Sequence, residues 1–171
     1  MSLLIIFSIG LCLAIFQSTL RGFLNVAGIV PDITLMYFLL SSKLYIRLTK
    51  KRDVFFELVF IGGCMGLVAG MYSAVSGVSF ILSYMSLSFL IYFWFQNALA
   101  KKIYSKLLYP VLFPVVFYSM MGVLGWLVDG RWIFYSSDVF FVSVLINGTA
   151  YFLMVGIART LFGTRSREFS L

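Results

Sequence analysis

Residues 58–100 read LVFIGGCMGLVAGMYSAVSGVSFILSYMSLSFLIYFWFQNALA and contain no charged side chain. A helix needs about 20 predominantly apolar residues to cross the hydrocarbon core of a bilayer, so this stretch is too long for one crossing and suits two. Its turn-like composition lies between Gly70 and Gly77, where serines stand at positions 73 and 76. The stretch therefore predicts two membrane-spanning helices, at about 54–72 and 78–98.

The rest of the chain has the same character. Of its 171 residues, 62% are apolar and 11% are charged, whereas soluble domains have about 45–50% and about 25%. We therefore expect residues 1–171 to form a single integral membrane domain, an all-α, polytopic transmembrane helical bundle. Six spans are predicted, at about 3–20, 31–46, 54–72, 78–98, 107–128 and 139–161.

The second span rests on the weakest pattern. Lys43 lies inside it and must extend its ammonium group towards an interface. If residues 33–46 did not cross, the chain would have five spans and this segment would be re-entrant. The apolar run Ile33-Thr-Leu-Met-Tyr-Phe-Leu-Leu40 suits an aqueous loop poorly, which favours six.

Basic residues fall in short clusters between the apolar runs. Lysine and arginine near span ends concentrate on the cytoplasmic side of a membrane. With six spans and both termini inside, Arg21 and Arg131 lie outside and eleven basic residues lie inside, at positions 43, 47, 50, 51, 52, 101, 102, 106, 159, 165 and 167. Topology thus explains the net charge of +7, and we expect a lipid bilayer as partner and no nucleic acid.

Three glycines share one face of the predicted 54–72 helix, because Gly62, Gly66 and Gly70 recur every four residues. Small residues allow helices in lipid to approach one another closely. Packing inside the bundle is the favoured interpretation. The alternative is a contact surface for the transmembrane helix of a partner.

Polar residues mark the facing ends of the first two spans. Gln17, Ser18 and Thr19 end the first span, and Pro31-Asp32 begins the second. Proline suits the first turn of a helix, and a carboxylate there complements the positive end of the helix dipole. We favour a helix cap, with an external contact site as the alternative.

Asn147 lies about nine residues into the last span, where an unpaired amide would be unfavourable. We expect its side chain to bond another helix. It is also the strongest candidate for a polar group that faces an internal cavity.

Catalytic chemistry is not predicted. All six carboxylates fall at or near predicted interfaces, and no pair has the spacing of an acid/base or metal site. The sequence has no histidine, no HExxH and no phosphate-binding glycine loop. Cys12 and Cys64 lie in apolar runs and act as small apolar side chains. We expect no enzymatic activity, no cofactor and no metal.

Two ordered motifs carry a resemblance to a known family. Phe16-Gln17-Ser18-Thr19-Leu20 ends the first span, and Gly28-Ile29-Val30-Pro31-Asp32 opens the second. Together with Gly62-Gly63-Cys64-Met65-Gly66-Leu67 and the later Gly77, they resemble the MreD family of bacterial rod shape-determining membrane proteins. The motifs cover about residues 10–80.

The resemblance implies a fold similar to the six-helix substrate-binding components of energy-coupling-factor transporters. It implies a location in the bacterial cytoplasmic membrane and a non-enzymatic role in the complex for cell elongation. The implied partners are the bitopic protein MreC and, through it, the peptidoglycan glycosyltransferase and transpeptidase pair and MreB. The alternative is a vitamin-binding component of such a transporter, although the first span has only Ala14 where those proteins present an Ala-xxx-Ala pattern.

Overall fold

The computed structural model describes residues 3–20, 23, 30–49, 54–71, 77–96, 103–130 and 137–162. Within these ranges the chain forms helices and no strand, which confirms the predicted all-α bundle. The helices are α1 (Leu3–Thr19), α2 (Ile33–Leu48), α3 (Phe55–Met71), α4 (Gly77–Gln96), α5 (Ile103–Asp129) and α6 (Ser137–Phe162). Many charged residues of the predicted loops lie outside the described residues, at positions 21, 50–53, 101, 102, 131, 165, 167 and 168.

Three of the described helices are long and apolar enough to cross a membrane. They contain the segments Gly77–Gln96, Leu108–Val128 and Asp138–Ala158. Helices α1 and α3 contain shorter apolar segments, Leu4–Thr19 and Phe55–Met71. The chain is therefore a helical membrane protein, in which helices of unequal length pack together.

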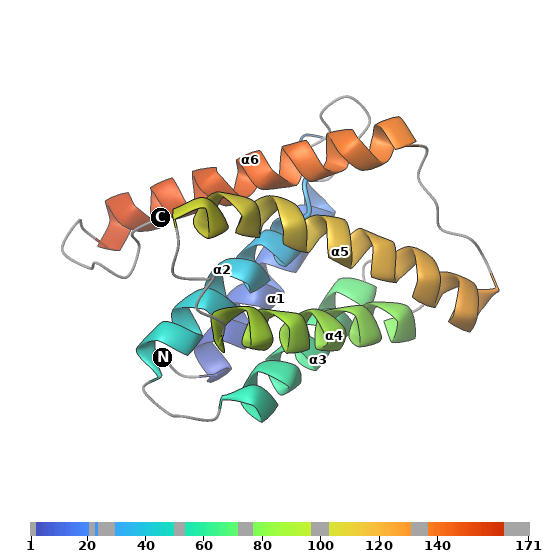
Figure 1. Ribbon diagram of the computed structural model, residues 1–171, viewed down its shortest axis with the longest axis horizontal. Coiled ribbons are helices and arrows are strands. Elements are labelled where there is room, and N and C mark those ends of the chain that lie inside the picture. Colours follow the sequence, from blue (N-terminus) through green and yellow to red (C-terminus); the bar gives the residue numbers. More distant parts are fainter. Residues whose placement is uncertain are drawn as a thin grey trace.

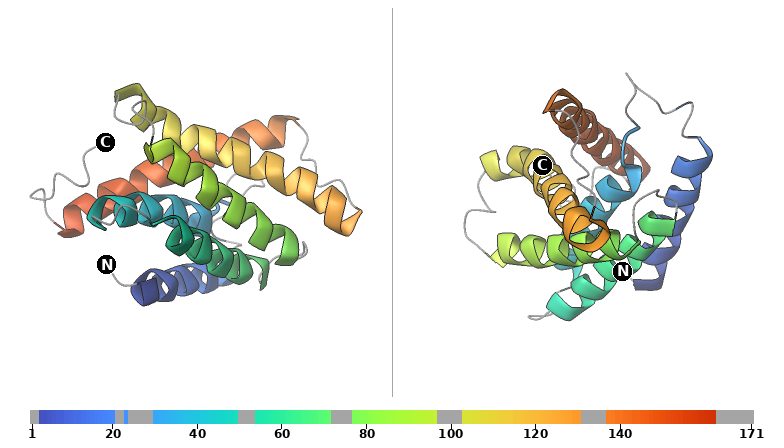
Figure 2. Two further views of the ribbon diagram at one scale, coloured as in Figure 1. Left: turned by 60° about the horizontal axis from the view of Figure 1, so that its bottom comes forward. Right: turned by 90° about the vertical axis from the view of Figure 1, so that its right-hand side faces the viewer.

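Helix α2 differs from the others in composition and in position. Its 16 residues extend about 24 Å, which is less than the roughly 30 Å of a hydrocarbon core. It carries Lys43 and Arg47, yet it contacts each of the other five helices. It runs between the α3–α4 pair and the α5–α6 pair, with α1 alongside (Figures 1 and 2). The weakest span of the sequence is thus the centre of the bundle.

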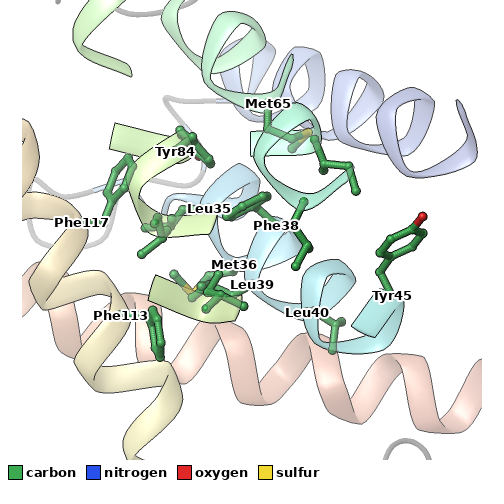
Figure 3. Close-up of a cluster of buried hydrophobic side chains, with 14 of the residues drawn as sticks. Leu35, Met36, Phe38, Leu39, Leu40, Tyr45, Met65, Tyr84, Phe113 and Phe117 are labelled. Carbon is green, nitrogen blue, oxygen red and sulfur yellow. The ribbon is translucent and has the colours of Figure 1, made fainter. Parts of the chain in front are cut away.

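The core is built around this central helix. Leu35, Met36, Phe38 and Leu39 are fully buried, and they point towards side chains of α3, α4 and α5 (Figure 3). The Tyr84 ring of α4 packs between two aromatic rings in edge-to-face geometry, with centroids 5.1 Å from Phe38 of α2 and 4.9 Å from Phe117 of α5. Such aromatic pairs are worth about 0.5–1.5 kcal/mol beyond the area they bury.

Tyrosine hydroxyls connect α2 to three neighbouring helices. Tyr37 of α2 donates to the Ile6 carbonyl of α1 at 3.1 Å, and Tyr109 of α5 donates to the Leu39 carbonyl at 3.0 Å. Tyr45 donates to the Glu57 carboxylate of α3. A phenol offers a large apolar ring with one polar tip, so it can fill the core and still bond a backbone carbonyl.

Three of the four glycines of α3, Gly62, Gly66 and Gly70, lie against the backbone of α4. A Cβ added at Gly66 would stand 2.6 Å from the Ile81 Cα, and one added at Gly70 would stand 2.7 Å from the Gly77 Cα. At Gly62 it would stand 2.7 Å from the Tyr84 carbonyl oxygen. Side chains larger than hydrogen would therefore force the two backbones apart. The close approach uses the glycine face inside the chain, as the packing interpretation expects.

This contact gives a matched pair of substitutions. Gly66→Ala should destabilise the protein by about 1–3 kcal/mol, because the added methyl group meets the α4 backbone. Gly63→Ala is the control, since its Cβ would lie 3.7 Å from the Met85 side chain, an ordinary contact, and alanine favours the helix by about 0.5–1 kcal/mol. Unfolding in sodium dodecyl sulfate, followed by far-UV circular dichroism, measures both. Equal stability of the two variants would contradict the proposed close packing.

Candidate functional site

The beginning of α2 is the centre of a polar cluster. Asp32 is the N-cap residue: its Oδ1 accepts from the Leu35 N–H at 2.9 Å, and its carbonyl accepts from the Met36 N–H at 3.0 Å. The Ile33 N–H donates to the Pro31 carbonyl at 3.0 Å. An N-cap carboxylate satisfies donors that a helix cannot pair internally, and it complements the positive end of the dipole.

Gln17 supplies a further acceptor from α1. Its Oε1 lies 3.1 Å from the Thr34 N–H and 3.3 Å from the Thr34 hydroxyl, both of which donate to it. Ser18 and Thr19 instead donate to the Ile15 carbonyl of their own helix, each at 2.8 Å. Of the polar residues that end the first span, Gln17 reaches the beginning of α2, whereas the two hydroxyls bond locally.

Asn147 completes the cluster from α6. Its Oδ1 accepts from the Asp32 N–H at 2.7 Å, and its Nδ2 donates to the Tyr118 hydroxyl of α5 at 2.7 Å and to the Ser143 carbonyl at 2.9 Å. The residue is 0% exposed. Because a backbone N–H can only donate, the amide oxygen has to face Asp32. One side chain thus connects α2, α5 and α6.

These bonds place the beginning of α2 deep in the bundle. Asn147 and Tyr118 both lie near the middle of the apolar segments Asp138–Ala158 and Leu108–Val128. The sequence pattern puts Asp32 at an interface, but the structure puts its backbone beside the centre of α6. Hydropathy alone assigns a carboxylate to the nearest boundary, and it cannot anticipate a half-buried cap beside the middle of another helix.

Tyr84 of α4 adds a hydroxyl that no described residue pairs. The side chain is 0% exposed, and its hydroxyl has no hydrogen-bond partner among the described residues. It is close enough to Asp32 and Tyr118 to interact with them electrostatically. Neither Tyr84 nor Tyr118 is singled out by the sequence, although a polar group in mid-span is the same signal that marks Asn147.

The chemistry available to this cluster is limited. Asp32 is a single carboxylate, and its Oδ1 already accepts a hydrogen bond as the helix cap. The other described carboxylates lie elsewhere: Glu57 of α3 accepts from Tyr45, near the other end of α2, and Asp138 is exposed in the first turn of α6. Within the described part of the chain, no group of three His, Cys, Asp or Glu residues could hold a metal ion. The arrangement is suited to joining helices and to hydrogen bonding a polar group.

No family model, curated protein or solved structure matches this chain.

Replacing Asn147 tests the cluster. Asn147→Leu keeps a similar volume but leaves the Asp32 N–H and the Tyr118 hydroxyl without this partner. The free energy of unfolding should fall by about 1–3 kcal/mol, because a buried group without a hydrogen bond is unfavourable by that order.

Thr149→Val is the matched control, since its exposed hydroxyl donates to the Leu145 carbonyl of its own helix. Denaturation in dodecyl sulfate compares the two variants with the unmodified chain. A loss for Thr149→Val as large as for Asn147→Leu would show that the cluster does not hold the helices together.

Proposed function

We propose that the chain is a non-enzymatic membrane scaffold of the MreD type, acting in the bacterial complex for cell elongation. One observation carries the proposal. The two motifs that underlie the resemblance contribute Gln17 and Asp32 to a single polar cluster. Asn147 of α6, which is 115 residues from Asp32 in the sequence, belongs to the same cluster. Their side chains join helices and do not assemble a reactive centre.

The state of the polar groups supports a scaffold over an enzyme. Gln17, Asp32 and Asn147 all bond backbone groups at the beginning of α2. General acid/base catalysis needs a group positioned to exchange a proton with substrate, whereas these groups fix the positions of α1, α2 and α6. A scaffold needs a rigid arrangement of helices, and such bonds provide it.

The exposed apolar faces support binding within the membrane. The glycine face of α3 is occupied by α4, so a partner helix would bind elsewhere on the bundle. Large apolar side chains are exposed on α1 and α6, including Leu4 at 74%, Phe141 at 65% and Leu145 at 67%. We propose that MreC presents its single transmembrane helix to the outer surface of the bundle, and that the peptidoglycan-synthesising pair and MreB associate through MreC.

Copurification tests this proposal. The tagged chain, extracted in mild detergent from the cells that make it, should elute with an MreC-like bitopic protein at a fixed ratio. Thr149→Val should retain that protein, and Asn147→Leu should lose it as the bundle loosens. A purified chain that carries no bitopic partner, in a preparation that remains folded by circular dichroism, would contradict the scaffold.

Orientation is part of the same proposal. With the C-terminus in the cytoplasm, green fluorescent protein fused after Leu171 should fluoresce. In a chain with Cys12→Ser and Cys64→Ser, the substitution Arg131→Cys should react with a membrane-impermeant maleimide added outside the cells. Labelling only after the cells are opened would reverse the assignment.

A second candidate function is favoured by Tyr84. Its buried hydroxyl, unpaired among the described residues, would suit a small polar ligand, as in the vitamin-binding component of an energy-coupling-factor transporter. Mass spectrometry of the denatured, freshly purified protein would then find one small molecule per chain, and Tyr84→Phe would lower its occupancy. A preparation without such a molecule would leave the scaffold as the proposed function.

A further inference from the structure

The Asp32 carboxylate carries a charge that capping a helix does not require. Its Oδ1 accepts from the Leu35 N–H at 2.9 Å, and asparagine or serine supplies such an acceptor about equally well without a charge. The helix dipole favours a carboxylate at this end, but a charge that is partly removed from water is unfavourable unless it is paired. The charge of Asp32 therefore needs an explanation besides the cap.

The described part of the chain supplies no cation to this carboxylate. None of the described residues forms an ion pair with Asp32, and the cations of α2, Lys43 and Arg47, lie near the other end of that helix. The Asp32 side chain is half-buried, and its N–H bonds Asn147 near the middle of the apolar segment of α6. Ionised groups at such a depth in membrane proteins usually pair with an opposite charge. A cation from a second protein can provide that pair.

The surroundings of Asp32 suit a second transmembrane helix. The beginning of α2 lies between α1 and α6 (right-hand view of Figure 2), where Gln17 of α1 and Asn147 of α6 bond its first residues. Helix α1 packs on α2 and α3, and α6 packs on α2 and α5. Large apolar side chains are exposed on both flanking helices near these bonds, Phe16 at 49% and Leu145 at 67%. An apolar helix that lies along α1 and α6 would thus pass the level of Asp32.

We propose that Asp32 pairs with a lysine or arginine in the transmembrane helix of the bitopic partner, and that this helix lies along α1 and α6. The inference rests on the proposed scaffold function, which supplies a partner with one transmembrane helix. A long basic side chain can lie along apolar surface and carry its charge to a carboxylate beside the helix. An arginine can donate two parallel hydrogen bonds to the carboxylate. The pair would neutralise both charges, and it would discriminate against transmembrane helices without a basic residue.

Copurification with Asp32→Asn tests the pair, because this substitution removes the charge and keeps the cap. The amide oxygen can accept from the Leu35 N–H, so unfolding in dodecyl sulfate should match that of the unmodified chain. Recovery of the bitopic partner should fall by roughly ten-fold or more, since loss of one member of a buried charge pair leaves the other charge unpaired.

Two further variants separate the charge from the cap and from general acidity. Asp138→Asn removes an exposed carboxylate from the first turn of α6 and should retain the partner. Asp32→Glu keeps the charge on a weaker cap and should retain most of the partner, although the bundle is less stable.

A substitution in the partner gives an independent measurement on the unmodified chain. Methionine in place of the basic residue of its transmembrane helix should lower recovery as much as Asp32→Asn does. The two substitutions together should cause no further loss, because either one alone already breaks the pair.

Two results would overturn the inference and leave the scaffold in place. In the first, Asp32→Asn is folded and recovers the partner in an unchanged amount, which would make the carboxylate a cap only. In the second, the transmembrane helix of the recovered partner has no lysine or arginine, or the methionine substitution leaves recovery unchanged. An unmodified chain that recovers no bitopic protein would instead contradict the scaffold and this contact together.

Discussion

The backbone N–H groups at the beginning of α2 have no acceptor within their own helix and need acceptors from elsewhere in the bundle. Within a bilayer each unpaired backbone group is unfavourable by several kcal/mol, and this helix begins beside the middle of α6. Three side chains supply acceptors: Asp32 from the cap, Gln17 from α1 and Asn147 from α6. Because each acceptor comes from a different element, satisfying the helix end also fixes the positions of those elements. The central place of α2, and with it the arrangement of the five helices around it, depends on these bonds.

The bundle reverses the distribution of polar and apolar groups that is found in water-soluble proteins. The most polar of the described helices lies in the centre, whereas phenylalanines on α3 and α6, such as Phe56 and Phe141, are 76% and 65% exposed. In lipid there is no hydrophobic driving force that buries apolar side chains between helices. Helix association therefore depends on close packing and on hydrogen bonds between helices. The glycines of α3 provide the first against α4, and the tyrosine hydroxyls that bond α2 provide the second.

The sequence predicts the helices better than it predicts their contacts. Lengths of apolar runs are local properties, so six helices could be placed within a few residues, although α5 begins at Ile103 and not near 107. The glycine spacing likewise indicates a packing face without naming α4. The position of Asn147 predicts a bond to another helix, which the structure contains. Its partner, the Asp32 N–H, could not be predicted, because the two residues are 115 positions apart in the sequence. Tyr84 and Tyr118 were missed because a hydroxyl within an apolar run hardly changes hydropathy.

The two ends of α2 carry opposite charges, and this polarity suits both the helix and its place in the bundle. Asp32 caps the positive end of the helix dipole, while Lys43 and Arg47 lie towards its negative end, so both charges suit the helix itself. They also suit the surroundings in one direction only. Asp32 lies beside the centre of α6, whereas Lys43 and Arg47 lie about 16 and 22 Å further along the helix axis. A reversed helix would place Arg47 beside the centre of α6 and would separate the Asp32 carboxylate from the N–H group that it caps. The same sequence of charges therefore stabilises the helix and places its basic end away from the polar cluster around Asp32.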